Sequence, residues 1–96
     1  MNLNTTIPAA TEKVVFHTLL NTERGKVRGI RMQAGQEIKV HKSPVPAILM
    51  VLAGKVSYFE GDHEKSLQSQ GYVLIQPEVL HRVTCREDAL CVLIQV

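Results

Sequence analysis

The stretch GQEIKVHKSPVPAILMVLAG, residues 35–54, decides the fold of this chain, and GYVLIQPEVLH, residues 71–81, has the same design. Each stretch opens on a glycine and carries one histidine, His41 or His81, beside a strand-like segment. Glycine at such places marks a turn, because it adopts a positive φ without a side-chain clash. The two stretches therefore predict paired strands whose imidazoles face each other across a small barrel.

Both stretches resemble the sequence motifs of the cupins. The longer cupin motif corresponds to Gly35-x5-His41-x-Ser43-x3-Ala47-x6-Gly54, and Ser43 and Ala47 stand where that family usually has a second histidine and a glutamate or glutamine. The shorter motif corresponds to Pro77-x3-His81, which lacks the family's glycine and is similar to the sensory cupin arm of AraC-type regulators. The resemblance spans residues 27–96 and implies an RmlC-like jelly roll, a double-stranded β-helix, with a degenerate metal-binding motif.

The remainder of the chain also has β-strand character. Short segments rich in β-forming residues follow one another, separated by turn signals such as Ala53-Gly54, Gly61-Asp62 and Gln70-Gly71, and no helical periodicity extends over ten residues. The expected strands are residues 14–20, 27–32, 38–41, 47–52, 55–60, 66–67, 72–76, 81–86 and 90–96. At 96 residues the chain has room for one domain. The sequence predicts an all-β domain at residues 14–96, after an arm or edge strand at residues 1–13.

Two of the expected strands, Ala47 to Leu52 and Leu90 to Ile94, are apolar at every position. A strand of this kind is buried on both faces. One face fills the barrel, and in an all-β protein the natural cover for the other is the sheet of a second subunit. The hydrophobic content of 45% supports the same interpretation, and we expect a homodimer.

Charge and composition exclude several classes of partner. The net charge is +2 and no run of lysine or arginine is long enough to follow a phosphate backbone, so nucleic acid is not expected. The apolar runs are shorter than the roughly 20 residues that cross a bilayer, and residues 1–11 lack the build of a signal peptide. We therefore expect a cytoplasmic protein without a membrane partner. Cys85 and Cys91, on the two arms of an expected hairpin, should then be reduced and buried.

Alternation along the strands selects the candidate site. Period-two spacing places His41 and Ser43 on the interior, followed by Ala47, and it places His81, Val83 and Cys85 there as well. A pocket with apolar walls and a few polar groups suits a small molecule. His41, Ser43, His81 and Cys85 are the candidate ligand-binding residues, whereas His17 and His63 are read as ordinary solvated residues.

Metal binding is a second function that the same two histidines suggest. His41 and His81 are candidate ligands for zinc, iron or nickel, but such sites use three or four protein ligands, and Ser43 and Ala47 do not complete the set. A third donor would come from Glu37, His63, Cys85 or the bound substrate. The resemblance also implies proton transfer without a metal, because cupins that epimerise sugars use a histidine paired with an acid and a tyrosine; here neither Tyr58 nor Tyr72 lies in a motif.

Three functions remain open from the sequence. The first is a small cupin that binds an unidentified small molecule between His41 and His81. The second is a metal-dependent oxygenase or isomerase with an incomplete two-histidine shell. The third is a regulatory or structural module with a vestigial pocket. Whether the chain is an enzyme, and what its ligand is, does not follow from the sequence, because one fold carries many chemistries.

Overall fold

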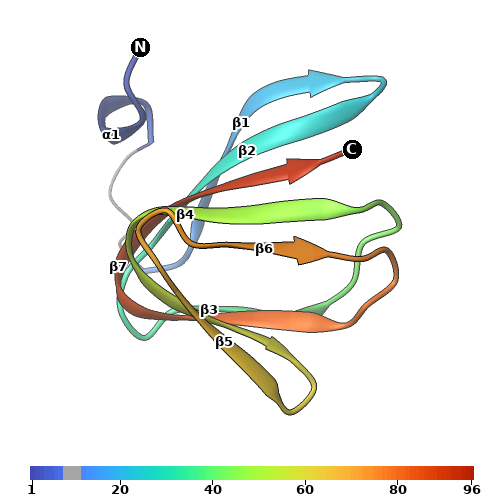
Figure 1. Ribbon diagram of the computed structural model, residues 1–96. Helices are drawn as coiled ribbons and strands as arrows, with labels where there is room; N and C mark the ends of the chain where they lie inside the picture. Colours follow the sequence, from blue (N-terminus) through green and yellow to red (C-terminus); the bar gives the residue numbers. More distant parts are fainter. Residues whose placement is uncertain (8–11) are drawn as a thin grey trace.

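The computed structural model describes residues 1–7 and 12–96, and β-strands dominate that part of the chain (Figure 1). It contains one short helix and seven strands: α1 (Leu3–Thr6), β1 (Val15–Thr22), β2 (Gly25–Met32), β3 (Glu37–His41), β4 (Ala47–Glu60), β5 (His63–Gln68), β6 (Tyr72–Ile75) and β7 (His81–Gln95). All the strand pairings are antiparallel. The prediction of an all-β double-stranded β-helix is confirmed.

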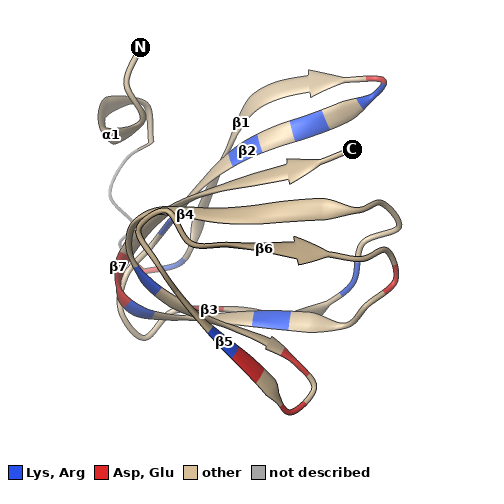
Figure 2. Cartoon of the chain, in the orientation of Figure 1, with Lys and Arg blue, Asp and Glu red and all other residues tan. Residues whose placement is uncertain are grey.

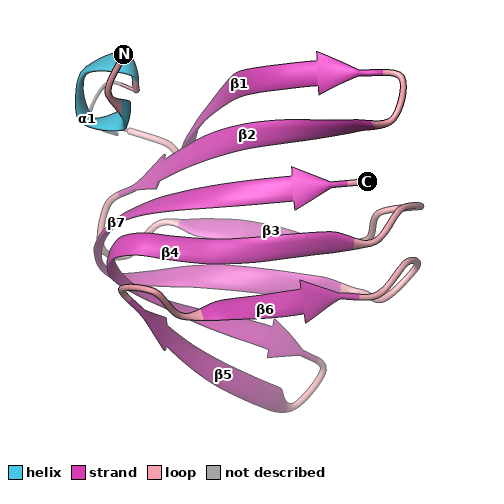
Figure 3. Cartoon of the chain, turned by 45° about the horizontal axis from the view of Figure 1, so that its top comes forward, coloured by secondary structure: helices cyan, strands magenta, loops and turns pink. Residues whose placement is uncertain are grey.

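Two long strands, β4 and β7, belong to both halves of the molecule. The first part of β4 pairs with the last part of β7, from Ala47↔Gln95 to Val51↔Cys91, and β2 and β6 add to the outer sides of this pair. The second part of β4 pairs with the first part of β7, from Val56↔Cys85 to Phe59↔Arg82, and β3 and β5 add there. The result is a five-stranded sheet, in the order β1-β2-β7-β4-β6, facing a four-stranded sheet, in the order β3-β7-β4-β5 (Figure 3).

The two sheets meet where β4 and β7 bend together, at the left of Figure 1, and part toward the right. The bend in β4 lies at Gly54, whose φ is +85°. A Cβ atom there would lie 2.0 Å from the carbonyl oxygen of Asp88 in β7. The register between the two strands shifts at the same place, between Val51 and Val56. Glycine is required here because the conformation is left-handed and the neighbouring backbone leaves no room for a side chain.

The bend corrects two sequence-based expectations. Ala53-Gly54 does not form a turn between separate strands, because the ladder with β7 resumes after an irregular step and β4 continues to Glu60. Cys85 and Cys91 likewise do not lie on two arms of a hairpin, because β7 runs through both. The expected turns at Gly61 and Gln70 are present, with φ values of +57° and +73°.

The core fills the space between the sheets. Alternate residues of β4 face inward, so that Ala47, Leu49 and Val51 are buried while Leu52 is exposed. The same alternation buries Val83 and Cys85 in β7. Cys85 and Cys91 are both buried free thiols, and burial raises the pKa of Cys91 to about 12.

The N-terminal segment packs on the outside of the five-stranded sheet. Residues 3–6, where the sequence left an arm or an edge strand open, form the helical turn α1. Ile7 follows it and is fully buried, with its Cδ1 against Gly29 on the outer face of β2. Part of the apolar outer face is therefore covered by this chain's own N-terminus. Residues 8–11 of the expected arm lie outside the described residues.

No helix in the described part of the chain has the length and apolar character needed to cross a bilayer.

Replacement of Gly54 by alanine tests the bend. Gly54→Ala should lower the free energy of unfolding by roughly 2 kcal/mol or more, because the methyl group meets the Asp88 carbonyl and the φ is unfavourable. Gly35 is the matched control, since its φ is +92° but nothing lies within 4 Å of its Cβ position. Gly35→Ala should show only the conformational cost, about 1 kcal/mol. Equal decreases in the free energy of unfolding of the two variants, measured in urea, would contradict this account of the bend.

Candidate functional site

Two histidines lie side by side at the open end of the four-stranded sheet. His41 is the last residue of β3 and His81 the first of β7, and the two are direct cross-strand partners. Their ring centroids are 4.2 Å apart, with the ring planes inclined at 59°. Side chains of partnered residues project to the same face of a sheet, so the antiparallel pairing of β3 with β7 is what brings the rings together.

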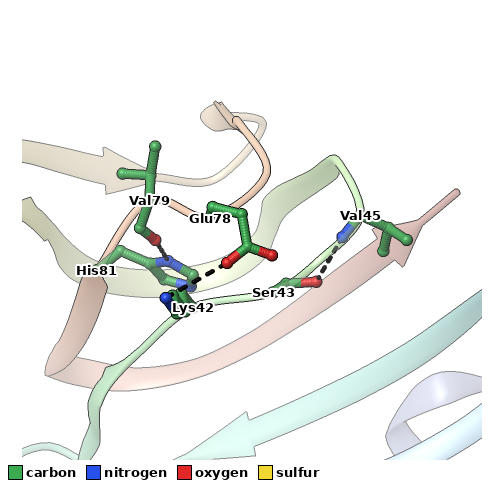
Figure 4. Close-up of polar contacts among 6 residues, drawn as sticks. All are labelled: Lys42, Ser43, Val45, Glu78, Val79 and His81. Atoms are coloured by element: carbon green, nitrogen blue, oxygen red, sulfur yellow. Dashed lines mark hydrogen bonds and ion pairs between the residues drawn. The ribbon is translucent and has the colours of Figure 1, made fainter.

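Both rings are held by the same local hydrogen bond. The Nδ1 of His41 lies 2.8 Å from the carbonyl oxygen of Lys39, and the Nδ1 of His81 lies 2.9 Å from that of Val79 (Figure 4 shows the second). A carbonyl oxygen only accepts hydrogen bonds, so each Nδ1 must carry the proton and donate. In the neutral imidazole the Nε2 atom is then left with a lone pair. Each ring is therefore set up to accept a proton or a hydrogen bond at Nε2.

Two loops fix the position of His81 at this rim. The loop before β4 and the loop before β7 are joined by a backbone hydrogen bond of 2.8 Å from the Glu78 N–H to the Ser43 carbonyl oxygen. An exposed ion pair of 3.4 Å between Lys42 and Glu78 spans the same two loops (Figure 4). Glu78 adopts a φ of +65°, the left-handed conformation for which the family's glycine is suited. The Pro77-to-His81 loop thus delivers His81 to the interior without that glycine.

His81 is buried, with 6% of its surface exposed, while His41 is exposed. The ring of Tyr58 stacks on His81 with a centroid distance of 5.7 Å. Burial lowers the pKa of His81; His41 nearby lowers it further, while the hydrogen bond to Val79 and the charge of Glu60 act in the opposite direction. His81 is therefore neutral near pH 7.

Tyr58 supports the site without supplying an acid to it. Its hydroxyl donates a hydrogen bond of 2.8 Å to Glu60 Oε1. Burial, together with this carboxylate, raises the pKa of Tyr58 well above its ordinary value. The phenol holds its proton and packs against His81.

A cavity of about 330 Å³ opens beside the two histidines, between the two sheets. Its walls are mainly apolar, and its polar lining residues are His41, His81, Arg28 and Lys39. The apolar lining residues come from both sheets: Phe16, Ile30, Ile38, Val40, Leu49, Ile75, Val83 and Leu93. This size and composition match those of small-molecule sites in proteins, which run from roughly 300 Å³ upward.

Two residues that the alternation placed in the site do not line this cavity. Ser43 lies in the rim loop, where its Oγ accepts hydrogen bonds of 3.3 Å from the Val45 N–H and from Gln95 Nε2. Cys85 lies farther along β7, near the bend, and its thiol donates to the Glu87 carbonyl oxygen at 3.0 Å. Alternation predicts which face of the sheet a residue occupies but not its position along the barrel. Cys85 points inward, as expected, but at the closed end of the barrel.

Arg28 and Lys39 are lining residues that the sequence reasoning missed. Arg28 alternates with Ile30 and Met32 in β2, and these two neighbours are buried in the core. The period-two pattern used for β4 would have placed Arg28 on the interior as well. Arg28 was not considered because charged residues usually lie on the surface.

The donor set does not fit a metal held by protein ligands alone. The cavity supplies two imidazoles and no carboxylate or thiol, and its other polar groups, Arg28 and Lys39, are cationic. No group of three or more histidine, cysteine, aspartate or glutamate side chains that could hold an ion occurs among residues 1–7 and 12–96. Zinc, iron and nickel sites need three or four such ligands, and a dication is repelled by neighbouring cations. Of the third donors considered from the sequence, Glu37, His63 and Cys85, none lines the cavity.

Solved structures resemble this chain over its full length. A cupin superfamily protein from Desulfitobacterium hafniense has a TM-score of 0.91 at 14% identity, covering 100% of this chain and 88% of that protein. An RmlC-like cupin protein from Desulfovibrio desulfuricans has a TM-score of 0.89 at 19% identity, covering 100% and 93%. A conserved protein with a double-stranded β-helix domain from Klebsiella pneumoniae has a TM-score of 0.88 at 18% identity, covering 100% and 87%.

No protein-family model matches the sequence, and no curated protein matches it. The likeness to solved structures at these identities establishes the fold and leaves the activity to be argued from the site. The chain has the RmlC-like double-stranded β-helix fold of the cupins.

Proposed function

We propose that this protein binds a small molecule in the cavity beside His41 and His81. The observation that carries the proposal is the pair of imidazoles, 4.2 Å apart, each held through Nδ1 so that Nε2 is available. They stand at a cavity of about 330 Å³ whose remaining walls are largely apolar. Apolar walls bind the body of a ligand, and a few fixed polar groups orient it. In this proposal Ser43 acts only indirectly, through its hydrogen bond with Gln95, and Cys85 takes no part.

The four histidines allow a test of this proposal with internal controls. His41 and His81 line the cavity, whereas His63 begins β5 and His17 lies on the outer side of β1. We expect that members of a panel of small aromatic and aliphatic carboxylates, alcohols and amines shift the ring signals of His41 and His81 in ¹H–¹³C NMR spectra. The signals of His17 and His63 should stay in place. A panel that moves no histidine ring, or moves all four alike, would refute the proposal.

The neutral state of His81 gives the folded protein a dependence on pH. The pKa of His81 in the folded chain lies below the ordinary value of 6.5, so below that pH the unfolded chain binds the proton more readily. The stability that His81 contributes is complete above pH 6.5 and is lost as the pH falls toward its folded pKa. The free energy of unfolding of the wild type, measured in urea, should therefore fall more steeply between pH 6.5 and 5 than that of His81→Gln. His63→Gln, at an exposed position, should follow the wild type; identical slopes for all three proteins would contradict the assignment.

We also propose a homodimer formed through the outer face of the five-stranded sheet. Two rows of apolar side chains cross this face in register: Leu74, Ile48, Ile94 and Val27 in one, and Tyr72, Met50 and Val92 in the other. Tyr72 and Leu74 are more than half exposed, at 59% and 57%. Neither row contains a charged residue, so the same sheet of a second copy can pack on it face to face.

Met50→Asp tests this assembly. The wild type should sediment as a dimer at high micromolar concentration, and Met50→Asp should sediment as a monomer, because an unpaired charge in the centre of an interface is poorly tolerated. Ser66→Asp, on an exposed position of β5, should remain dimeric. A wild type that stays monomeric at this concentration would overturn the assembly without touching the binding site.

Cytoplasmic location is a further part of the proposal. It is supported by Cys85 and Cys91, which are buried and unbridged as in proteins of reducing compartments.

A further inference from the structure

We infer that the ligand of this cavity is a small carboxylate with an apolar body, and that Arg28 binds its carboxylate group. The inference rests on the proposed function, because it names the class of molecule that the cavity takes. It is carried by the position and the incomplete hydrogen bonding of the Arg28 side chain.

Arg28 projects into the barrel from the five-stranded sheet, on the wall opposite the two histidines. In the ladder it is the partner of Leu93, and both residues line the cavity. Figure 2 shows that β2 carries basic residues and no acidic ones. A guanidinium on the interior side of a strand loses hydration, which is costly unless another charge or a full set of acceptors replaces the water.

The protein supplies only part of that replacement. Arg28 Nη2 donates a hydrogen bond of 3.0 Å to Gln95 Oε1, but its Nε is buried without a partner. The ion pairs in the described part of the chain are Lys42–Glu78 and Arg86–Glu64, and neither involves Arg28. A buried donor without an acceptor is unfavourable, and more so when the group is charged. The cavity thus contains a cation that lacks a counter-charge.

The guanidinium is also held in place before any ligand arrives. Gln95 accepts from Arg28 and donates to Ser43 Oγ at 3.3 Å, which ties the arginine to the rim loop. The ring of Phe16, another lining residue, lies 5.3 Å from the guanidinium carbon. A planar group fixed in this way is suited to a flat, two-oxygen partner.

The other charged residue in the lining is positive, as Arg28 is. Lys39, an exposed residue, is the other cationic residue in the lining, and no aspartate or glutamate is found among the described residues that line the cavity. Walls of low polarity strengthen the field of such cations, so an anion is favoured over a neutral or cationic ligand.

A carboxylate fits better than a phosphate. Phosphate offers three or four strongly hydrated oxygens and needs several donors, whereas this cavity holds one fixed guanidinium among mostly apolar walls. A carboxylate needs two donors for its two oxygens, and an apolar body fills the remainder. The imidazoles on the opposite wall then accept a hydrogen bond from any hydroxyl or amine at the far end of the ligand.

Three probes with the same apolar body and different head groups test the inference: phenylacetate, 2-phenylethanol and 2-phenylethylamine. Each is titrated into the wild-type chain and followed by NMR. Phenylacetate should bind at least about tenfold more tightly than the alcohol, with the amine weakest, because hydrogen bonds to charged groups are the stronger ones. Arg28→Gln should reduce phenylacetate affinity about tenfold or more and leave the alcohol nearly unchanged.

Arg31→Gln is the matched control. Arg31 lies on the same strand and also has a buried Nε without a partner, but it faces outward, where its Nη2 donates to Asn4 Oδ1 at 3.3 Å. This variant should bind phenylacetate as the wild type does. If Arg28→Gln does not fold, the comparison of the three probes on the wild type still decides whether the cavity prefers a carboxylate.

The outcomes separate this inference from the proposed function. If the alcohol or the amine binds as tightly as phenylacetate and shifts His41 and His81, the cavity binds small molecules but the preference for a carboxylate is wrong. If phenylacetate binds equally well to Arg28→Gln, Arg28 is not the anchor and the inference is wrong as well. If no probe in the wider panel reaches the two histidines, the proposed function and this inference fall together.

Discussion

The close approach of β4 and β7 at Gly54 is the constraint on which the other features of this molecule depend. Because a side chain at Gly54 would collide with the Asp88 carbonyl, the two strands can bend together only at a glycine. The bend lets each of them serve both sheets, so the sheets are joined at one end and part at the other. The cavity lies within this opening, and its walls are strands rather than flexible loops.

The same arrangement explains why residues distant in the sequence meet. β7 has β3 beside its first part and β2 beside its last part. His41 is brought to His81 by the first pairing, and Arg28 is brought to Leu93 by the second. A cavity with acceptors on one wall and a guanidinium on the other therefore follows from the path of a single strand. Sites built on paired strands are held more firmly than sites on loops, which agrees with the proposal of a cavity that is formed before a ligand binds.

Much of the fold could be predicted from the sequence because it depends on local signals. Period-two spacing located the buried face of β4, and Gly61 marked a true turn. The continuity of β4 and β7 could not be predicted in the same way. A glycine that ends a strand and a glycine that bends one look alike in sequence, and the difference lies in the Asp88 backbone, which is more than thirty residues away. The α1 turn and the packing of Ile7 on Gly29 were missed because four residues are too few to show periodicity.

The site was predicted less completely than the fold. The pairing of His41 with His81 followed from the two motifs, since each motif fixes one histidine at a strand end. Ser43 and Cys85 were placed beside them because alternation tells which face a residue occupies and not how far along the barrel it lies. Arg28 was overlooked because a charged residue is normally outside, and its inward position is the departure from that rule that gives the cavity its chemical character.

The cavity offers two imidazole rings whose Nδ1 atoms are occupied by backbone carbonyls and whose Nε2 atoms are free. Long-range ¹H–¹⁵N correlation spectra of the ligand-free protein at about pH 8 test this most directly, because the nitrogen shifts distinguish the two neutral tautomers of histidine. We expect both His41 and His81 to carry the proton on Nδ1, with unprotonated Nε2. Protonation on Nε2 in either ring would contradict it, since the acceptors assigned to the cavity would then be donors.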